Sequence, residues 1–196
     1  MVAKQRANSG DALPKFFGGI DNRIRYKGFD LDFFFSFAYG NKVFNGAKAA
    51  LYNYTSADAP NLSPDMLKYW KKAGDITQIP GLTNASSLAK FSPTASQIFD
   101  YTVQRTSDRF LEDGSFIRLR NITMAYNLPV SALSQLGISK SRIKIFAEAN
   151  NVFIITKYSG IDPEVSAYGS SALSIGYDEI TMPNPRTMRF GFKIGL

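Results

Sequence analysis

The sequence predicts an all-β fold: about five antiparallel strands that form a segment of a transmembrane β-barrel, joined by long, partly helical loops. Two observations predict it. Apolar and polar residues alternate along several stretches of 11–15 residues, which is enough to cross a bilayer at a tilt. The connections between these stretches are short and long in turn, which is typical of barrels with tight turns at one end and large loops at the other.

The first strand pair lies within residues 19–40. The apolar residues occupy even positions up to Tyr26 and odd positions from Phe29 onward. A two-residue turn at Lys27-Gly28 explains the change, because it places Tyr26 opposite Phe29 on one apolar face. The same register places arginines opposite aspartates on the other face: Arg25 with Asp30 and Arg23 with Asp32. Both faces therefore agree with one hairpin.

Three further alternating stretches are predicted as strands: Phe116–Tyr126, Arg142–Thr156 and Arg186–Leu196. In the first of them the apolar phase changes near Arg120-Asn121, which predicts either a β-bulge or a strand that runs past the membrane edge. The two longest connections are residues 41–107, with 67 residues, and residues 157–185, with 29 residues.

Alternation alone does not distinguish a membrane barrel from a soluble sheet, since both have one apolar and one polar face. Two features favour the barrel. Aromatic residues make up 14% of the chain, and barrels carry aromatic girdles at both membrane interfaces. A compact soluble domain rarely contains a connection as long as residues 41–107. A soluble β-rich binding module with a helical insertion is the alternative.

The long connection contains local helix signals. Ser63-Pro64-Asp65 is typical of a helix start and Gly74 of a residue just after a helix, which predicts a helix over Pro64–Ala73. One face of this helix would carry Met66, Leu67 and Trp70. A second short helix is predicted around Gly46–Asn53. Residues 1–15 and 78–106 are expected to be irregular.

The chain has no Cys and no His. Their absence excludes disulfides, thiol nucleophiles, Cys/His zinc sites, Ser-His-Asp triads and imidazole acid–base catalysis. Phosphate-binding glycine motifs are also absent from the sequence. The net charge is +7, without any run of more than two basic residues, which does not indicate nucleic-acid binding. We expect no catalytic residues, no cofactor and no metal site.

Acidic pairs and loop aromatics are the remaining candidates. Asp30 and Asp32 resemble paired catalytic carboxylates, but the arginines opposite them favour ion pairing. Asp162 and Glu164 could serve a weak calcium site, although no spaced loop of oxygen ligands accompanies them. Aromatic loop residues are the candidates for contact with a substrate or partner, and packing within the loops is the equal alternative for them: Tyr52, Tyr54, Tyr69, Trp70 and Tyr168.

Four blocks of the sequence, together spanning about Pro14–Leu196, resemble one known family. They are RYKGFDLDFFFSFAYGNKVFN (Arg25–Asn45), DRFLEDGSFIRLRNITMAYNLP (Asp108–Pro129), RIKIFAEANNVFIITKYSGIDPEV (Arg142–Val165) and PNPRTMRFGFKIGL (Pro183–Leu196). In order and spacing they are similar to the C-terminal end of SusC/RagA-type TonB-linked outer-membrane proteins.

The resemblance implies a barrel of about 22 strands with a plug, set in outer-membrane lipid and importing glycans or peptides beneath a SusD-like surface lipoprotein. Residues 1–196 would be the C-terminal part of that barrel, with 41–107 and 157–185 as extracellular loops. The plug and the contact with the TonB system would belong to N-terminal parts outside this chain. The expected contribution is barrel wall and surface loop, without catalysis.

Overall fold

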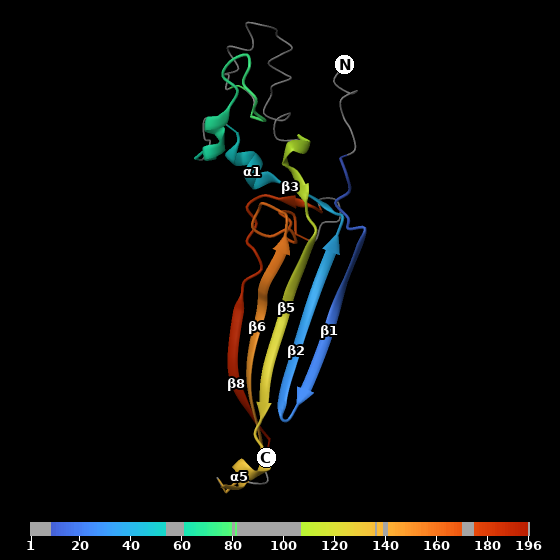
Figure 1. Cartoon of the computed structure of the whole chain (residues 1–196), viewed down its shortest axis with the longest axis vertical. Coiled ribbons are helices and arrows are strands. Elements are labelled where there is room, and N and C mark those ends of the chain that lie inside the picture. The colour runs from blue at the N-terminus through green and yellow to red at the C-terminus, as the bar shows by residue number, and fades with distance from the viewer. Residues whose placement is uncertain are drawn as a thin grey trace.

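The computed structural model describes residues 9–53, 61–79, 81, 107–135, 137–138, 141–169 and 175–195. Its main sheet has five antiparallel strands in the order β1-β2-β5-β6-β8, which stand side by side in Figure 1. Their bounds are β1 Phe16–Tyr26, β2 Phe29–Tyr39, β5 Phe116–Asn127, β6 Arg142–Thr156 and β8 Thr187–Gly195. Among the described residues the edge strands β1 and β8 each pair with one neighbour only. The sheet is therefore open rather than closed into a barrel of its own.

The predicted hairpin register is confirmed. Tyr26 pairs with Phe29, and the two arginines lie opposite the two aspartates as expected. Lys27 and Gly28 have φ angles of 46° and 90°, which is the backbone of a two-residue turn with both central residues in the left-handed region. Glycine adopts this conformation without steric cost, so Gly28 suits its position in the turn.

The predicted bulge in β5 is also confirmed. The pairing of β5 with β6 shifts register between Leu119 and Asn121, so Arg120 is the extra residue. As a result Arg120 and Asn121 both project to the polar face: Arg120 Nε donates to Ser36 Oγ at 2.8 Å, and Asn121 Nδ2 donates to Asn150 Oδ1 at 2.9 Å. The bulge restores the apolar phase from Ile122 onward.

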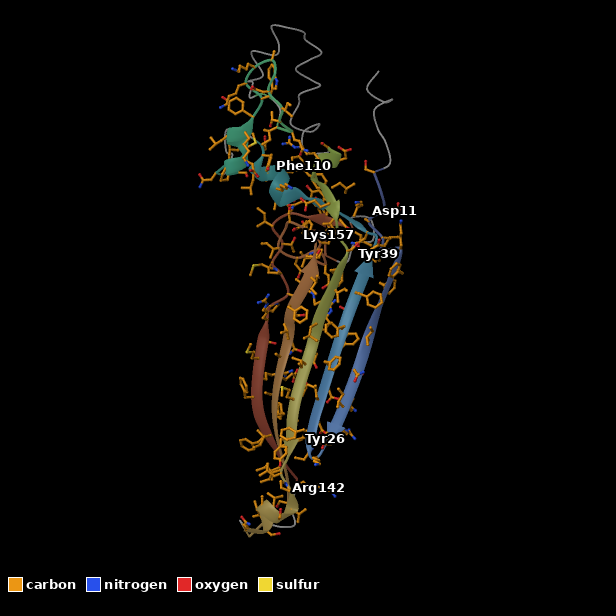
Figure 2. The ribbon with its side chains drawn as sticks, in the orientation of Figure 1. Asp11, Tyr26, Tyr39, Phe110, Arg142 and Lys157 are labelled. Atoms are coloured by element: carbon orange, nitrogen blue, oxygen red, sulfur yellow. The ribbon has the colours of Figure 1, made fainter. Side chains whose placement is uncertain are left out.

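Short and long connections lie at opposite ends of the sheet (Figure 1). The β1–β2 turn and helix α5 (Val130–Gln135) are at one end. At the other end lie helix α1 (Gly46–Leu51), the 3₁₀-helices Pro64–Lys68 and Asp108–Phe110, and the small strands described below. Figure 2 shows Tyr26 and Arg142 near the first end, and Tyr39 and Lys157 near the second. We call the second end the loop end.

A second sheet, which the sequence did not predict, closes the base of the long connection. Strand β3 (Lys42–Asn45) pairs antiparallel with β4 (Leu111–Asp113) and parallel with β7 (Tyr177–Asp178). Gly114 N donates to Asn41 O at 2.9 Å, so the β2–β5 ladder continues directly into β3–β4. We call the paired strands β3 and β4 the loop stem, because they hold together the two ends of the connection.

The predicted helix over Pro64–Ala73 is wrong in its second half. A 3₁₀-helix covers Pro64–Lys68, with Ser63 Oγ accepting from Asp65 N at its start, and Tyr69 is already extended. The Asp75 carboxylate then accepts the backbone N–H groups of residues 71 and 72 at 2.9 and 3.0 Å. This local hydrogen bonding competes with a further helical turn. The second predicted helix is confirmed as α1, capped by the Asn45 side chain.

The shared apolar face expected for the first helix is also wrong. Met66 is buried, whereas Leu67 is 76% exposed and Trp70 is 45% exposed. Because the helix ends early, its length is too short to place these three side chains along one stripe. Only Met66 packs into the interior of the loop end.

The buried apolar residues lie mainly outside the main sheet. Beyond Leu119 and Ala125 in β5, they belong to strand β3, the loops and the short helices: Val43, Ala49, Met66, Ile79, Phe110, Leu133 and Tyr158. The sheet instead presents bare apolar side chains. No helix among the described residues has both the length and the apolar character needed to cross a bilayer.

Candidate functional site

One face of the main sheet is a continuous apolar surface. Cross-strand pairing aligns its side chains in rows, such as Ile24, Leu31, Met124, Ala147 and Phe190. Many of its large side chains are more than half exposed, and Phe190 is 79% exposed. A monomeric soluble protein rarely leaves a patch of this extent uncovered. The arrangement fits a face that contacts an apolar medium.

Aromatic pairs lie at both ends of this apolar face. The rings of Phe29 and Tyr126 lie 4.4 Å apart at the turn end, and those of Phe16 and Tyr39 lie 4.9 Å apart at the loop end. Ten residue steps along β1 separate the two rows, which corresponds to roughly 33 Å along a strand. At the tilt of a membrane barrel this length gives an apolar band about 25 Å tall, as such barrels have.

The opposite face carries paired charges. Asp30 accepts from Lys144 Nζ at 2.7 Å and lies 3.7 Å from Arg25 Nε. Asp32 contacts Arg23 in the register predicted from the sequence. Both aspartates are therefore engaged by cations rather than left as a pair of free carboxylates. The face suits contact with water, where such pairs are stable but individually weak.

A buried ion cluster ties the second long connection to this polar face. Arg118 Nη2 lies 2.5 Å from Asp162 Oδ1, and the two side chains are only 5% and 3% exposed. Glu164 contacts both Arg118 and Arg120. Asp162 also accepts from the backbone N–H groups of Glu164 at 3.0 Å and Asn184 at 3.4 Å. The structure thus gives both carboxylates arginine partners instead of a calcium ion, and no metal-ligating group of three was found among the described residues.

Glu112 organises a second cluster at the loop end. Its carboxylate accepts from Lys48 Nζ at 2.9 Å, from Ser159 N at 2.8 Å and from Ser159 Oγ at 2.7 Å. Burial opposes ionisation, but these donors outweigh it and lower the pKa of Glu112 below its ordinary value. Nearby, burial and a 2.7 Å hydrogen bond to Asp178 raise the pKa of Tyr158. These contacts join α1, the loop stem and the segment after β6.

We expect Glu112→Gln to destabilise the loop end by about 1–3 kcal/mol at neutral pH, because a charged acceptor is lost. Glu112 has a lower pKa in the folded state, so it stabilises the fold above pH 4.5. That contribution is lost as the pH falls through the lowered folded-state pKa. Hydrogen exchange of residues 111–113, corrected for intrinsic pH effects, should show a weaker acid dependence in the variant. An unchanged dependence would contradict this assignment.

Five aromatic rings form a row across the loop end. Tyr52 and Tyr168, two of the sequence candidates, lie at its two ends, and Figure 2 labels Phe110 within it. Successive centroid distances are 5.8 Å for Tyr52–Phe110, 6.2 Å for Phe110–Phe44, 5.2 Å for Phe44–Tyr177 and 5.5 Å for Tyr177–Tyr168. The row shows that both candidates pack within the loops. Tyr168 still leaves 55% of its surface exposed.

The remaining candidates do not join this row. Tyr69 has Lys71 Nζ 5.2 Å from its ring centroid. Trp70 donates its backbone N–H to Ile79 O at 2.9 Å and is 45% exposed. Tyr54 lies outside the described residues. The structure therefore does not bring the four described candidates into one binding site.

A pocket of about 260 Å³ opens beside Tyr52. Lys48, Asp65, Lys68 and Arg109 contribute charged groups to its wall. Tyr52 Oη donates to Asp65 at 3.1 Å, and the Arg109 guanidinium lies 5.0 Å from the Tyr52 ring centroid. Sequence reasoning missed Arg109, since nothing local indicates that it meets a residue of α1 across the long connection.

Comparisons with known proteins agree with this architecture. TonB-dependent receptor P39 of Formosa agariphila is 30% identical over 204 residues, covering 98% of this chain and 17% of the receptor. TonB-dependent receptor P3 of the same organism is 29% identical over 189 residues, covering 94% of this chain and 17% of the receptor. TonB-dependent receptor SusC of Bacteroides thetaiotaomicron is 29% identical over 184 residues, covering 93% of this chain and 14% of SusC. The chain is thus similar in sequence to TonB-dependent receptors, SusC among them. No protein-family model matches it.

Solved structures of a peptide importer share the fold. The structure of the RagAB peptide importer in its "closed-closed" state matches with a TM-score of 0.68 and 23% identity, covering 95% of this chain and 17% of that one. A structure of the RagAB peptide transporter matches with a TM-score of 0.69 and 22% identity, covering 95% of this chain and 18% of that one. The chain thus spans about one sixth of the TonB-dependent receptors that it resembles, and at this identity the structural likeness concerns the fold alone.

Proposed function

We propose that the chain forms barrel wall and surface loops of an outer-membrane TonB-dependent importer of glycans or peptides. The observation that carries the proposal is the bare apolar face, which is framed by aromatic pairs at both ends. In a barrel of about 22 strands this face contacts lipid, and the face with Asp30, Asp32 and Arg118 lines the water-filled interior. A soluble module would have to cover the apolar face, and the described loops lie at the end of the sheet instead (Figure 1).

The loop end is the extracellular end in this proposal, because barrels of this kind have short turns on the periplasmic side and long loops outside. The segments 41–107 and 157–185 then meet the substrate and a SusD-like lipoprotein. Tyr52, Tyr69, Trp70 and Tyr168 supply aromatic surface for such contacts, together with Tyr54. The kinship with SusC and the fold shared with the RagAB importer support this role.

The chain contributes no catalysis in this proposal. The carboxylates of Asp30, Asp32 and Asp162 are held by arginine or lysine, and the sequence has neither His nor Cys. Energy for uptake comes from the TonB system, acting through other parts of the receptor. The chain's own tasks are to complete the wall, to line the interior and to present the loops.

Deleting residues 52–70 from the full-length receptor should reduce uptake or lipoprotein docking while leaving the barrel in the outer membrane. The deletion removes four of the five aromatic candidates and keeps the loop stem, so strand pairing is preserved. Substrate uptake, co-purification of the lipoprotein and outer-membrane fractionation measure the three quantities. Deleting the same number of residues from within 82–106 is the matched control. Unchanged uptake and docking after removal of 52–70 would contradict the assignment of this loop.

A further inference from the structure

The pocket beside Tyr52 has one positive charge in excess among the described residues. Lys48 Nζ pairs with Glu112 at 2.9 Å, and Lys68 Nζ pairs with Asp65 at 2.8 Å. These two lysines are thereby compensated. Arg109 also lines the pocket, and among the residues that the structure describes it has no carboxylate partner. The charge balance of the pocket therefore matches a ligand with one negative charge.

The Arg109 guanidinium is held in place by aromatic rings rather than by a salt bridge. Its central carbon lies 5.0 Å from the Tyr52 ring centroid and 5.5 Å from that of Phe110. The attraction between a cation and the aromatic rings limits the positions of the guanidinium and does not use its N–H groups as donors to a carboxylate. Tyr52 is fixed in turn by its hydrogen bond to Asp65 and its edge contact with buried Phe110. The guanidinium is thus oriented before a ligand arrives.

We propose that this pocket binds a carboxylate group of the imported ligand, with Arg109 as its principal partner. Guanidinium and carboxylate match in a two-pronged geometry that combines charge with two hydrogen bonds. A volume of about 260 Å³ holds one side chain or one sugar ring rather than a whole oligomer. An acidic peptide and a uronic-acid glycan offer the same group, so the shared recognition element is the carboxylate. The inference rests on the proposed function only in taking the ligand to be the imported one.

Binding should be measured on the purified full-length receptor with two pairs of probes. One pair is a C-terminally amidated pentapeptide with one glutamate and its glutamine counterpart, which has no carboxylate, and the other is an oligogalacturonate and its methyl ester. We expect the wild type to prefer the acidic member of one pair, which identifies the source of the carboxylate. Arg109→Gln should weaken binding of that acidic probe about tenfold to hundredfold and leave its neutral counterpart unchanged.

A second variant is expected to change the affinity for the acidic probe in the opposite direction. Asp65→Asn removes the negative charge from the pocket wall and keeps an acceptor for Tyr52, so it should strengthen binding of the acidic probe about twofold to fivefold. A misfolded loop cannot produce a gain, which separates this result from damage to the structure. Lys71→Gln is the matched control, since Lys71 also lies over a tyrosine ring but outside the pocket. It should change neither affinity.

The inference is overturned if neither acidic probe binds more tightly than its neutral counterpart. It is also overturned if Arg109→Gln weakens both members of a pair equally, or if Asp65→Asn fails to strengthen acidic binding. None of these results bears on membrane insertion or on uptake of neutral ligands, which test the proposed function separately. Because binding is measured on purified receptor, the outcome does not depend on transport.

Discussion

Ile122→Arg in the full-length receptor should prevent most of the protein from reaching the outer membrane. Ile122 lies near the middle of the apolar band, between Phe33 on β2 and Ala149 on β6. In the proposed barrel its side chain meets the hydrocarbon core, where an arginine costs about 2–4 kcal/mol. Two or three kilocalories per mole are a large share of the stability of a typical fold. Outer-membrane fractionation and heat-modifiable migration on gels measure the loss.

Thr123→Arg is the matched control for this prediction. Thr123 is the next residue of the same strand and faces the polar side, opposite Asp32 and Glu148. An arginine there meets two carboxylates and water, so insertion should remain at the wild-type level. Equal insertion of the two variants would contradict the assignment of the apolar face to lipid. A defect confined to Thr123→Arg would show that the two faces had been exchanged.

Arg118→Met should release the second long connection, residues 157–185, from the main sheet. The substitution keeps much of the side-chain volume but leaves the Asp162 carboxylate, now only 3% exposed, without its cation. Breaking a buried pair in this way typically costs about 3–5 kcal/mol. Protease cleavage within residues 157–185 of the intact receptor should therefore become much faster, and hydrogen exchange there should rise.

Two further variants test whether loss of the buried Arg118–Asp162 pair is the reason for the faster cleavage. Arg189→Met breaks an ion pair with Glu148 on the same face, but Arg189 is 67% exposed, so cleavage of residues 157–185 should hardly change. Adding Asp162→Asn to Arg118→Met should restore part of the protection, because a neutral amide is less costly to bury than a lone carboxylate. Wild-type protection in Arg118→Met alone would show that the buried cluster does not hold the connection.

Features with a local signature could be predicted from the sequence. The hairpin turn and the bulge both reverse the two-residue alternation, and such a change is visible within a few residues of its cause. The loop stem was missed because its strands are only three and four residues long. Strands of that length show no alternation, and their pairing joins segments that lie far apart in the chain.

The same holds for the candidate residues: the sequence identifies single residues by type, but it does not predict their contacts with distant parts of the chain. Aromatic character identified Tyr52 and Tyr168, but their connection through Phe44, Phe110 and Tyr177 depends on the loop stem. The arginine partner of Asp162 lies 44 residues earlier in the chain, so composition offered no reason to prefer it over calcium. The sequence around Ser63 correctly predicts where the helix starts. Its end differs from the prediction because the Asp75 carboxylate accepts hydrogen bonds from backbone N–H groups after Tyr69.

The loop stem separates sequence changes in the long connection from changes that would alter strand register in the main sheet. Gly40 N donates to Ser115 Oγ at 2.9 Å, and the β3–β4 pairing continues the wall beyond that point. The pairing of β3 with β4 offsets the entropic free energy of closing the long connection. Lengthening the segment beyond the stem adds little to that free energy, because it grows only with the logarithm of the loop length. Residues between α1 and Asp108 can therefore diverge, lengthen or shorten without disturbing strand register below. If the proposed function holds, this segment can change its ligand contacts while the pairing of the main sheet stays the same.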